Sequence, residues 1–88
     1  MEHSLKEYKG WIVSELRRGK NTINVTRLRI SSICFFHSML AENEPGIDNQ
    51  ASIQLSTSDG CSILIIYKKD EIEKYHQDLA FLNSLIYK

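Results

Sequence analysis

The side chains of this 88-residue chain that could carry chemistry are three histidines and two cysteines. His3, His37 and His76 lie far apart in the sequence, and no two of them have the spacing of helical metal ligands. Cys34 and Cys61 form neither a CxxC pair nor a Cys/His cluster. We therefore expect surface or boundary histidines, two reduced thiols, no metal site and no cofactor.

The residue pattern supports neither nucleophilic catalysis nor phosphate binding. A nucleophilic serine or cysteine needs a base and an oxyanion hole, yet no GxSxG elbow occurs and no fixed cation accompanies Cys61. The acidic residues Asp70, Glu71 and Glu73 are explained by the favourable charge they bring to a helix N-terminus. The four glycines are scattered and make no phosphate loop. We therefore expect a protein that is not an enzyme.

Two local concentrations of charge stand out, although eleven basic and eleven acidic residues cancel overall. A basic run suits phosphates or an acidic protein surface, and it consists of Arg17, Arg18, Lys20, Arg27 and Arg29. An acidic run suits a basic enzyme surface, and it consists of Glu42, Glu44 and Asp48. Basic runs are usually solvated faces, and a solvated loop explains the acidic run most simply. A molecule without net charge also has little long-range attraction for nucleic acid.

The first element that must position these residues is predicted to be a helix over residues 4–19. Its apolar side chains recur at helical steps of three and four: Leu5, Tyr8, Ile12 and Leu16. Ser4 and Glu7 have the spacing of a capping box, and Gly19 stands where a helix commonly ends. Gly10 is unfavourable inside such a helix. If this helix and the next element form a hairpin, the basic side chains would cluster near its bend.

The next segment, residues 22–40, is ambiguous, and we favour a largely helical element. A helix beginning near Asn24 would gather the large apolar side chains on one broad face. The alternation in TINVTRLRI, with its Thr, Ile and Val residues, is instead typical of a strand. A short strand over Thr22–Val25 is therefore the alternative for its start. The AENEPG that follows is predicted to be a loop, because Pro45 and Gly46 interrupt either structure.

Residues 53–67 predict a β-hairpin with a type I′ turn at Asp59-Gly60. A two-residue turn would place four apolar side chains on one face, pairing Ile53 with Ile66 and Leu55 with Leu64. The first strand is polar on its other face, as an edge strand often is. The second strand, Cys61–Tyr67, is apolar on both faces, which is typical of an interior strand.

The last element is predicted to be an amphipathic helix that begins near Asp70. Asp70 and Glu73 have capping-box spacing, and apolar residues recur at helical intervals: Ile72, Tyr75, Leu79, Leu82 and Ile86. The chain is thus expected to be one α+β domain over residues 1–88. Its predicted order is an N-terminal helix, a second mostly helical element, a β-hairpin and the C-terminal amphipathic helix.

The doubly apolar strand of the hairpin leads to the functional expectation. Either a strand from residues 22–40 covers it, or a partner does, which would be a second copy of the chain or a different protein. The second case favours a small non-enzymatic protein-binding module, such as an inhibitor, an immunity-type protein or an adaptor. The alternative is a nucleic-acid-binding module that uses the basic segment 17–29.

The expected partner is therefore another protein, including a second copy in a homodimer, and nucleic acid is the lesser candidate. No secretory signal and no apolar run of membrane-spanning length is evident, so we expect a cytoplasmic protein without a membrane partner. The candidate contact residues combine both charged runs with the reverse face of the second strand: Arg17, Arg18, Lys20, Arg27, Arg29, Glu42, Glu44, Asp48, Ile63, Ile65 and Tyr67.

Overall fold

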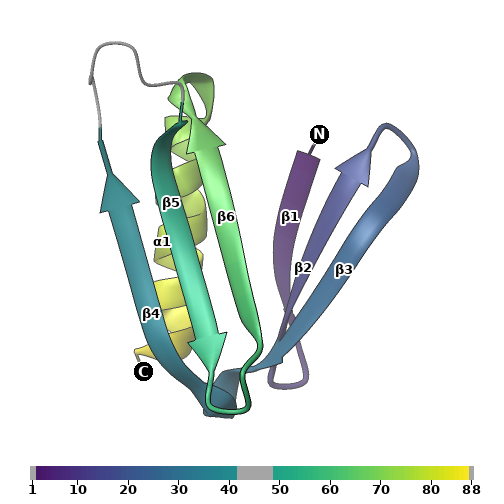
Figure 1. Ribbon diagram of the computed structural model, residues 1–88, viewed down its shortest axis with the longest axis vertical. Helices are drawn as coiled ribbons and strands as arrows, with labels where there is room; N and C mark the ends of the chain where they lie inside the picture. Colours follow the sequence, from purple (N-terminus) through teal and green to yellow (C-terminus); the bar gives the residue numbers. More distant parts are fainter. Residues whose placement is uncertain (1, 42–48, 88) are drawn as a thin grey trace.

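Two three-stranded antiparallel sheets and a C-terminal helix make up the computed structural model, which describes residues 2–41 and 49–87 (Figure 1). The first sheet is a meander of β1 (Glu2–Tyr8), β2 (Trp11–Arg18) and β3 (Asn21–Arg29). The second is a meander of β4 (Ile33–Leu40), β5 (Asn49–Thr57) and β6 (Ser62–Lys68). The helix α1 (Ile72–Ile86) follows. The α+β class and this helix were predicted correctly.

The predicted N-terminal helix is wrong, because residues 2–18 form the hairpin β1–β2. Its turn is Lys9-Gly10, in which both residues have positive φ, 49° and 87°. This is the pattern of a type I′ turn, which matches the twist of the strands it joins. A Cβ on Gly10 would meet no atom within 4 Å, so the backbone conformation rather than crowding calls for glycine.

The prediction of a mostly helical second element is also wrong, and the strand alternative for its start was the correct interpretation. The chain forms β3, then the short 3₁₀ helix η1 (Ile30–Ser32), and then β4. In β3, Leu28 pairs with Ile12 and both side chains are buried. Alternation with β-branched residues therefore outweighed the helical grouping of apolar side chains. The predicted loop that follows lies mainly outside the described residues.

The predicted hairpin is present as β5–β6, but its register differs by one residue. Ile53 pairs with Ile65 and Leu55 with Ile63. The connection is longer than two residues, because the Thr57 N–H donates to the Cys61 carbonyl at 2.8 Å. A shift of one residue moves every side chain to the opposite face. Ile63 and Ile65 are therefore buried, whereas the predicted core residues Leu64 and Ile66 are 59% and 47% exposed.

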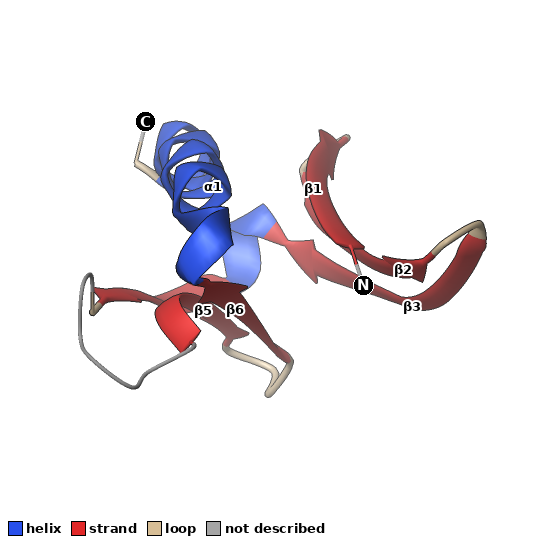
Figure 2. Ribbon diagram, turned by 90° about the horizontal axis from the view of Figure 1, so that it is seen from above, coloured by secondary structure: helices blue, strands red, loops and turns tan. Residues whose placement is uncertain are grey.

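The core lies between α1 and the inner face of the second sheet, and one side of the first sheet joins it (Figure 2). Its buried members come from both sheets and the helix: Ile12, Leu28, Ala51, Ile53, Leu55, Ile63, Ile65, Tyr67, Tyr75 and Leu82. Full burial of a large apolar side chain contributes roughly 1.5–3 kcal/mol, so this shared cluster holds the two sheets and the helix together.

Candidate functional site

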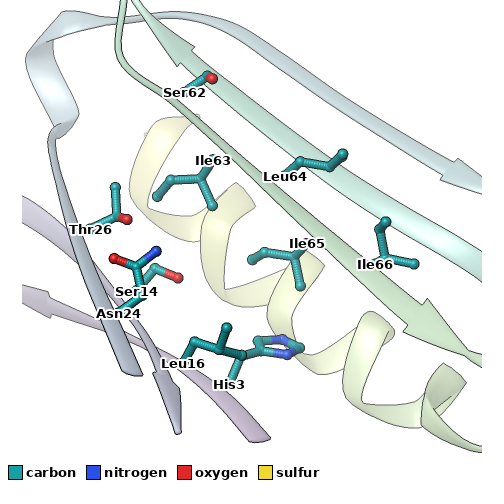
Figure 3. Close-up of a pocket in the computed structure, with 10 residues that line it drawn as sticks. All are labelled: His3, Ser14, Leu16, Asn24, Thr26, Ser62, Ile63, Leu64, Ile65 and Ile66. Carbon is teal, nitrogen blue, oxygen red and sulfur yellow. The ribbon is translucent and has the colours of Figure 1, made fainter. Parts of the chain in front are cut away.

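A groove of about 250 Å³ separates β6 from the inner face of the first sheet (Figure 3). One wall is five consecutive residues of β6, from Ser62 to Ile66. Alternate residues of a strand point to opposite faces, so all five can border one groove only along the edge of the strand. Among the described residues β6 pairs with β5 alone. Its second row of backbone N–H and C=O groups therefore faces the groove.

This arrangement reverses the prediction of which hairpin strand is interior. The more polar strand, β5, lies between β4 and β6, and the more apolar strand is at the edge. Residues 22–40 do supply a strand to this sheet, but β4 pairs on the far side of β5 and leaves β6 uncovered. An interior antiparallel strand needs only one buried face, so the polar face of β5 can remain at the surface.

The outer face of the second sheet carries apolar side chains along its two margins. On β6, Leu64 and Ile66 are exposed, and on β4, Phe35 and Met39 are 45% and 54% exposed. The β5 residues between these margins are polar: Ser52, Gln54 and Ser56. The exposed apolar surface next to the free strand edge therefore consists of Leu64 and Ile66.

The other wall of the groove is largely polar. Ser14 of β2 and Asn24 and Thr26 of β3 line it together with Leu16 (Figure 3). Ser14 pairs with Thr26 and Leu16 with Asn24, so these side chains share one face of the first sheet. Hydroxyl and amide groups thus lie across the groove from the strand edge, where they can form hydrogen bonds to a polar backbone.

One end of the groove is closed by a polar clasp, which we define as His3, Tyr67, Lys74 and Asp78. The Tyr67 hydroxyl donates to Asp78 Oδ2 at 2.7 Å, and His3 Nε2 lies 3.2 Å from the same oxygen. Lys74 Nζ donates to the His3 carbonyl. The His3 and Tyr67 rings meet edge to face at 5.1 Å. The clasp thus joins β1 and β6 to α1.

Burial and hydrogen bonding set the ionisation of the clasp. Burial opposes the charge on Asp78, but the hydrogen bonds with His3 and Tyr67 outweigh it and hold the pKa of Asp78 below its usual value. Burial first, and then the hydrogen bond to Asp78, raise the pKa of Tyr67 well above its usual value. Tyr67 is fully buried, so its hydroxyl reaches no substrate. The clasp is therefore a largely buried polar contact that fixes β1 and β6 on α1.

The structure divides the predicted basic cluster into two groups. Arg17, Arg18 and Lys20 lie at the β2–β3 turn, whereas Arg27 and Arg29 lie toward the far end of β3. Their separation along the sheet is about 20–25 Å at the rise of a β-strand. The expected gathering of these side chains near one bend does not occur.

The remaining predicted contact residues lie elsewhere. Ile63, Ile65 and Tyr67 are in the core, although the two isoleucines also line the groove (Figure 3). Glu42, Glu44 and Asp48 lie outside the described residues. Leu64 and Ile66 were not among the predicted contact residues, because the predicted two-residue turn placed them in the core. His3 and Asp78 were not predicted either, because they are 75 positions apart and have no local signature.

Within residues 2–41 and 49–87, no group of three His, Cys, Asp or Glu side chains is arranged to hold a metal ion. In the same part of the chain no helix combines the length and apolar character that a membrane crossing requires. Comparison with protein-family models, curated proteins and solved structures gave no match. The function is therefore inferred from the surfaces of the molecule itself.

Proposed function

We propose that this chain is a protein-binding module that takes up an extended segment of a partner protein along the edge of β6. The observation that carries the proposal is the edge of an apolar strand that borders a groove and pairs with no other strand than β5 in the described part of the chain. Addition of a strand to a sheet edge is a recurrent mode of peptide recognition, in which main-chain hydrogen bonds supply affinity and alternate side chains supply specificity.

The surroundings of β6 support an extended segment as the occupant. A strand paired with β6 would place every second side chain beside Leu64 and Ile66 on the outer face. Its remaining side chains would enter the groove toward Ser14 and Thr26. The preferred segment therefore has apolar residues at alternate positions and small or polar residues between them. The β1, β3 and β4 strands are also at sheet edges, but the first sheet lines the groove with alternate residues of one face, whereas β6 lines it with five consecutive residues along its edge.

The test selects displayed random peptides on the immobilised full chain and measures their affinities by calorimetry. Hydrogen exchange then locates the contact, and we expect peptide binding to protect the amides of residues 62–66. The double variant L64K/I66K should lose affinity at least about tenfold, because it places two charges beside the added strand. F35K/M39K is the matched control, because it places the same two charges at residues of similar exposure on the same face but on β4.

Two results would contradict the proposal. The first is peptide binding that protects the amides of another strand from hydrogen exchange instead of those of residues 62–66. The second is a selected peptide that binds L64K/I66K as tightly as the unmodified chain. Sedimentation of the chain alone tests the remaining occupant, a second copy, which would appear as a concentration-dependent dimer abolished by L64K/I66K.

A further inference from the structure

The outer face of the first sheet, opposite the groove, carries a basic and aromatic platform, which we define as Tyr8, Lys9, Trp11, Arg27 and Arg29. Strand pairing brings it together, since Tyr8 pairs with Trp11 and Trp11 with Arg29. Tyr8 is 60% and Trp11 is 37% exposed. We infer that this platform binds single-stranded nucleic acid, a function independent of the β6 groove.

The aromatic and cationic groups of the platform are already in contact. The Arg29 guanidinium lies 5.0 Å from the centre of the Trp11 ring, and Lys9 Nζ lies 5.4 Å from the centre of the Tyr8 ring. A guanidinium held against an indole offers both a flat surface for a base and N–H donors for a phosphate. Such stacking tolerates any sequence, because every base has a π-face.

The charge balance of the platform favours an anion. Arg27 and Arg29 are exposed, and within the described residues neither of them nor Lys9 forms an ion pair. Two carboxylates are nearby: Glu7 accepts a hydrogen bond from the Gly10 N–H at 2.8 Å, and Asp59 lines a depression with both arginines. The charge of Arg29 contributes to the lowered pKa of Asp59, after the hydrogen bond from Thr57. Asp59 therefore weakens anion binding without abolishing it.

Two depressions flank the Trp11–Arg29 pair. One, of about 560 Å³, includes Lys9 and Ser31, and the other, of about 380 Å³, includes Arg27 and Asp59. Both volumes fall in the range of small-molecule sites, roughly 300–1,000 Å³. Neighbouring bases of a single strand can therefore enter on either side of the stacked pair. A duplex is a poorer fit, because its bases are stacked on one another and it relies on many more phosphate contacts.

The experiment uses Trp11 as its reporter, because it is the only tryptophan of the chain. Titration of the full chain with oligo(dT) and oligo(U) should quench its fluorescence. If Lys9, Arg27 and Arg29 each contact one phosphate, a plot of log affinity against log salt should have a slope of about −2, at roughly 0.7 per phosphate contact. Affinity should therefore fall about tenfold to twentyfold between about 50 and about 200 mM salt.

Matched variants locate the site. R27A/R29A should lose at least about tenfold in affinity and flatten the salt slope to less than half. R17A/R18A removes the same charge at the other end of the sheet and should bind as the unmodified chain does. D59N removes the opposing carboxylate and should bind more tightly. Circular dichroism confirms that each variant is folded.

Each alternative result overturns the inference. Absence of quenching, or binding that does not depend on salt, excludes the platform as a phosphate site. Equal loss in R17A/R18A places the contact elsewhere. A poly-glutamate peptide that competes as strongly as the oligonucleotide indicates an acidic protein surface as the ligand, since such a peptide has charge but no bases.

Discussion

The clasp between Asp78, Tyr67 and His3 gives the sharpest test of how this fold is held together. Y67F removes the hydroxyl that donates to Asp78 at 2.7 Å and leaves the ring in its edge-to-face contacts with His3 and Tyr75. The loss of a hydrogen bond to a charged, half-buried acceptor should lower the free energy of unfolding by about 1.5–3 kcal/mol. Urea unfolding at pH 7, followed by circular dichroism, measures this difference.

The pH dependence of the same pair has a defined sign. The folded-state pKa of Asp78 is lowered, so its stabilising contribution is fully present above the ordinary value of about 3.9. The contribution is lost as the pH falls through the lower folded-state pKa. A protonated Asp78 accepts only a weaker, neutral hydrogen bond. The difference in the free energy of unfolding between the unmodified chain and Y67F should therefore become smaller in that acid range.

A double-mutant cycle shows whether the two residues act together. Y67F and D78N should be coupled by about 0.5–3 kcal/mol, because Y67F removes the donor of the contact and D78N removes the negative charge that strengthens it. L64A, an exposed change on β6, is the control and should shift the free energy of unfolding by less than about 0.5 kcal/mol. Purely additive effects of Y67F and D78N, or a Y67F loss below about 0.5 kcal/mol, would refute the clasp as a stabilising contact.

Three further perturbations test the register, the first turn and the thiols. I65A should lower the free energy of unfolding in urea by about 2–5 kcal/mol and I66A by far less, because Ile65 is buried and Ile66 is exposed. Equal losses would contradict this register and support the predicted two-residue turn. G10A should cost about 1 kcal/mol in the same assay, because alanine disfavours the φ of 87°, and an unchanged midpoint would contradict the type I′ turn. Cys34 and Cys61 are both exposed free thiols, so a thiol-reactive dye should label both without denaturant, and protection of either until unfolding would contradict its placement.

The sequence identifies the second half of the fold better than the first. The helix α1 shows a long helical period, and the β5–β6 hairpin shows two β-rich runs around Asp59-Gly60. The hairpin register could not be derived in this way, because β6 has isoleucine or leucine at four successive positions. With apolar side chains on both faces, the alternation that normally selects a register is absent.

The N-terminal helix was predicted from a coincidence of periods. Leu5, Ile12 and Leu16 share one face in the structure, because the Lys9-Gly10 turn changes the phase of the alternation between β1 and β2. The same three residues also fit helical steps. Tyr8 distinguishes the two cases, since it lies with Trp11 on the opposite face. A glycine at the centre of the segment was the local signal for a turn.

The candidate surfaces depend on contacts that are distant in sequence, which explains why residue patterns located them only in part. The platform pairs Trp11 with Arg29, which lie 18 positions apart and are brought together by the β2–β3 turn. The basic run was visible in the sequence, but the aromatic neighbours of its last two arginines were not. The clasp joins the two ends of the described chain, and only the completed fold places its members side by side.

The polar row of β5 has a consequence for the tendency of this molecule, which has no net charge, to self-associate. A chain with no net charge has little electrostatic repulsion between copies. Ser52, Gln54 and Ser56 interrupt what would otherwise be a continuous area of exposed apolar surface from β4 to β6. Replacing Gln54 with leucine would merge the two halves of that area, and sedimentation should then report stronger self-association than that of the unmodified chain. Hydrophilic side chains at the centre of the sheet thus limit the size of the exposed apolar surface in a molecule whose net charge supplies little repulsion.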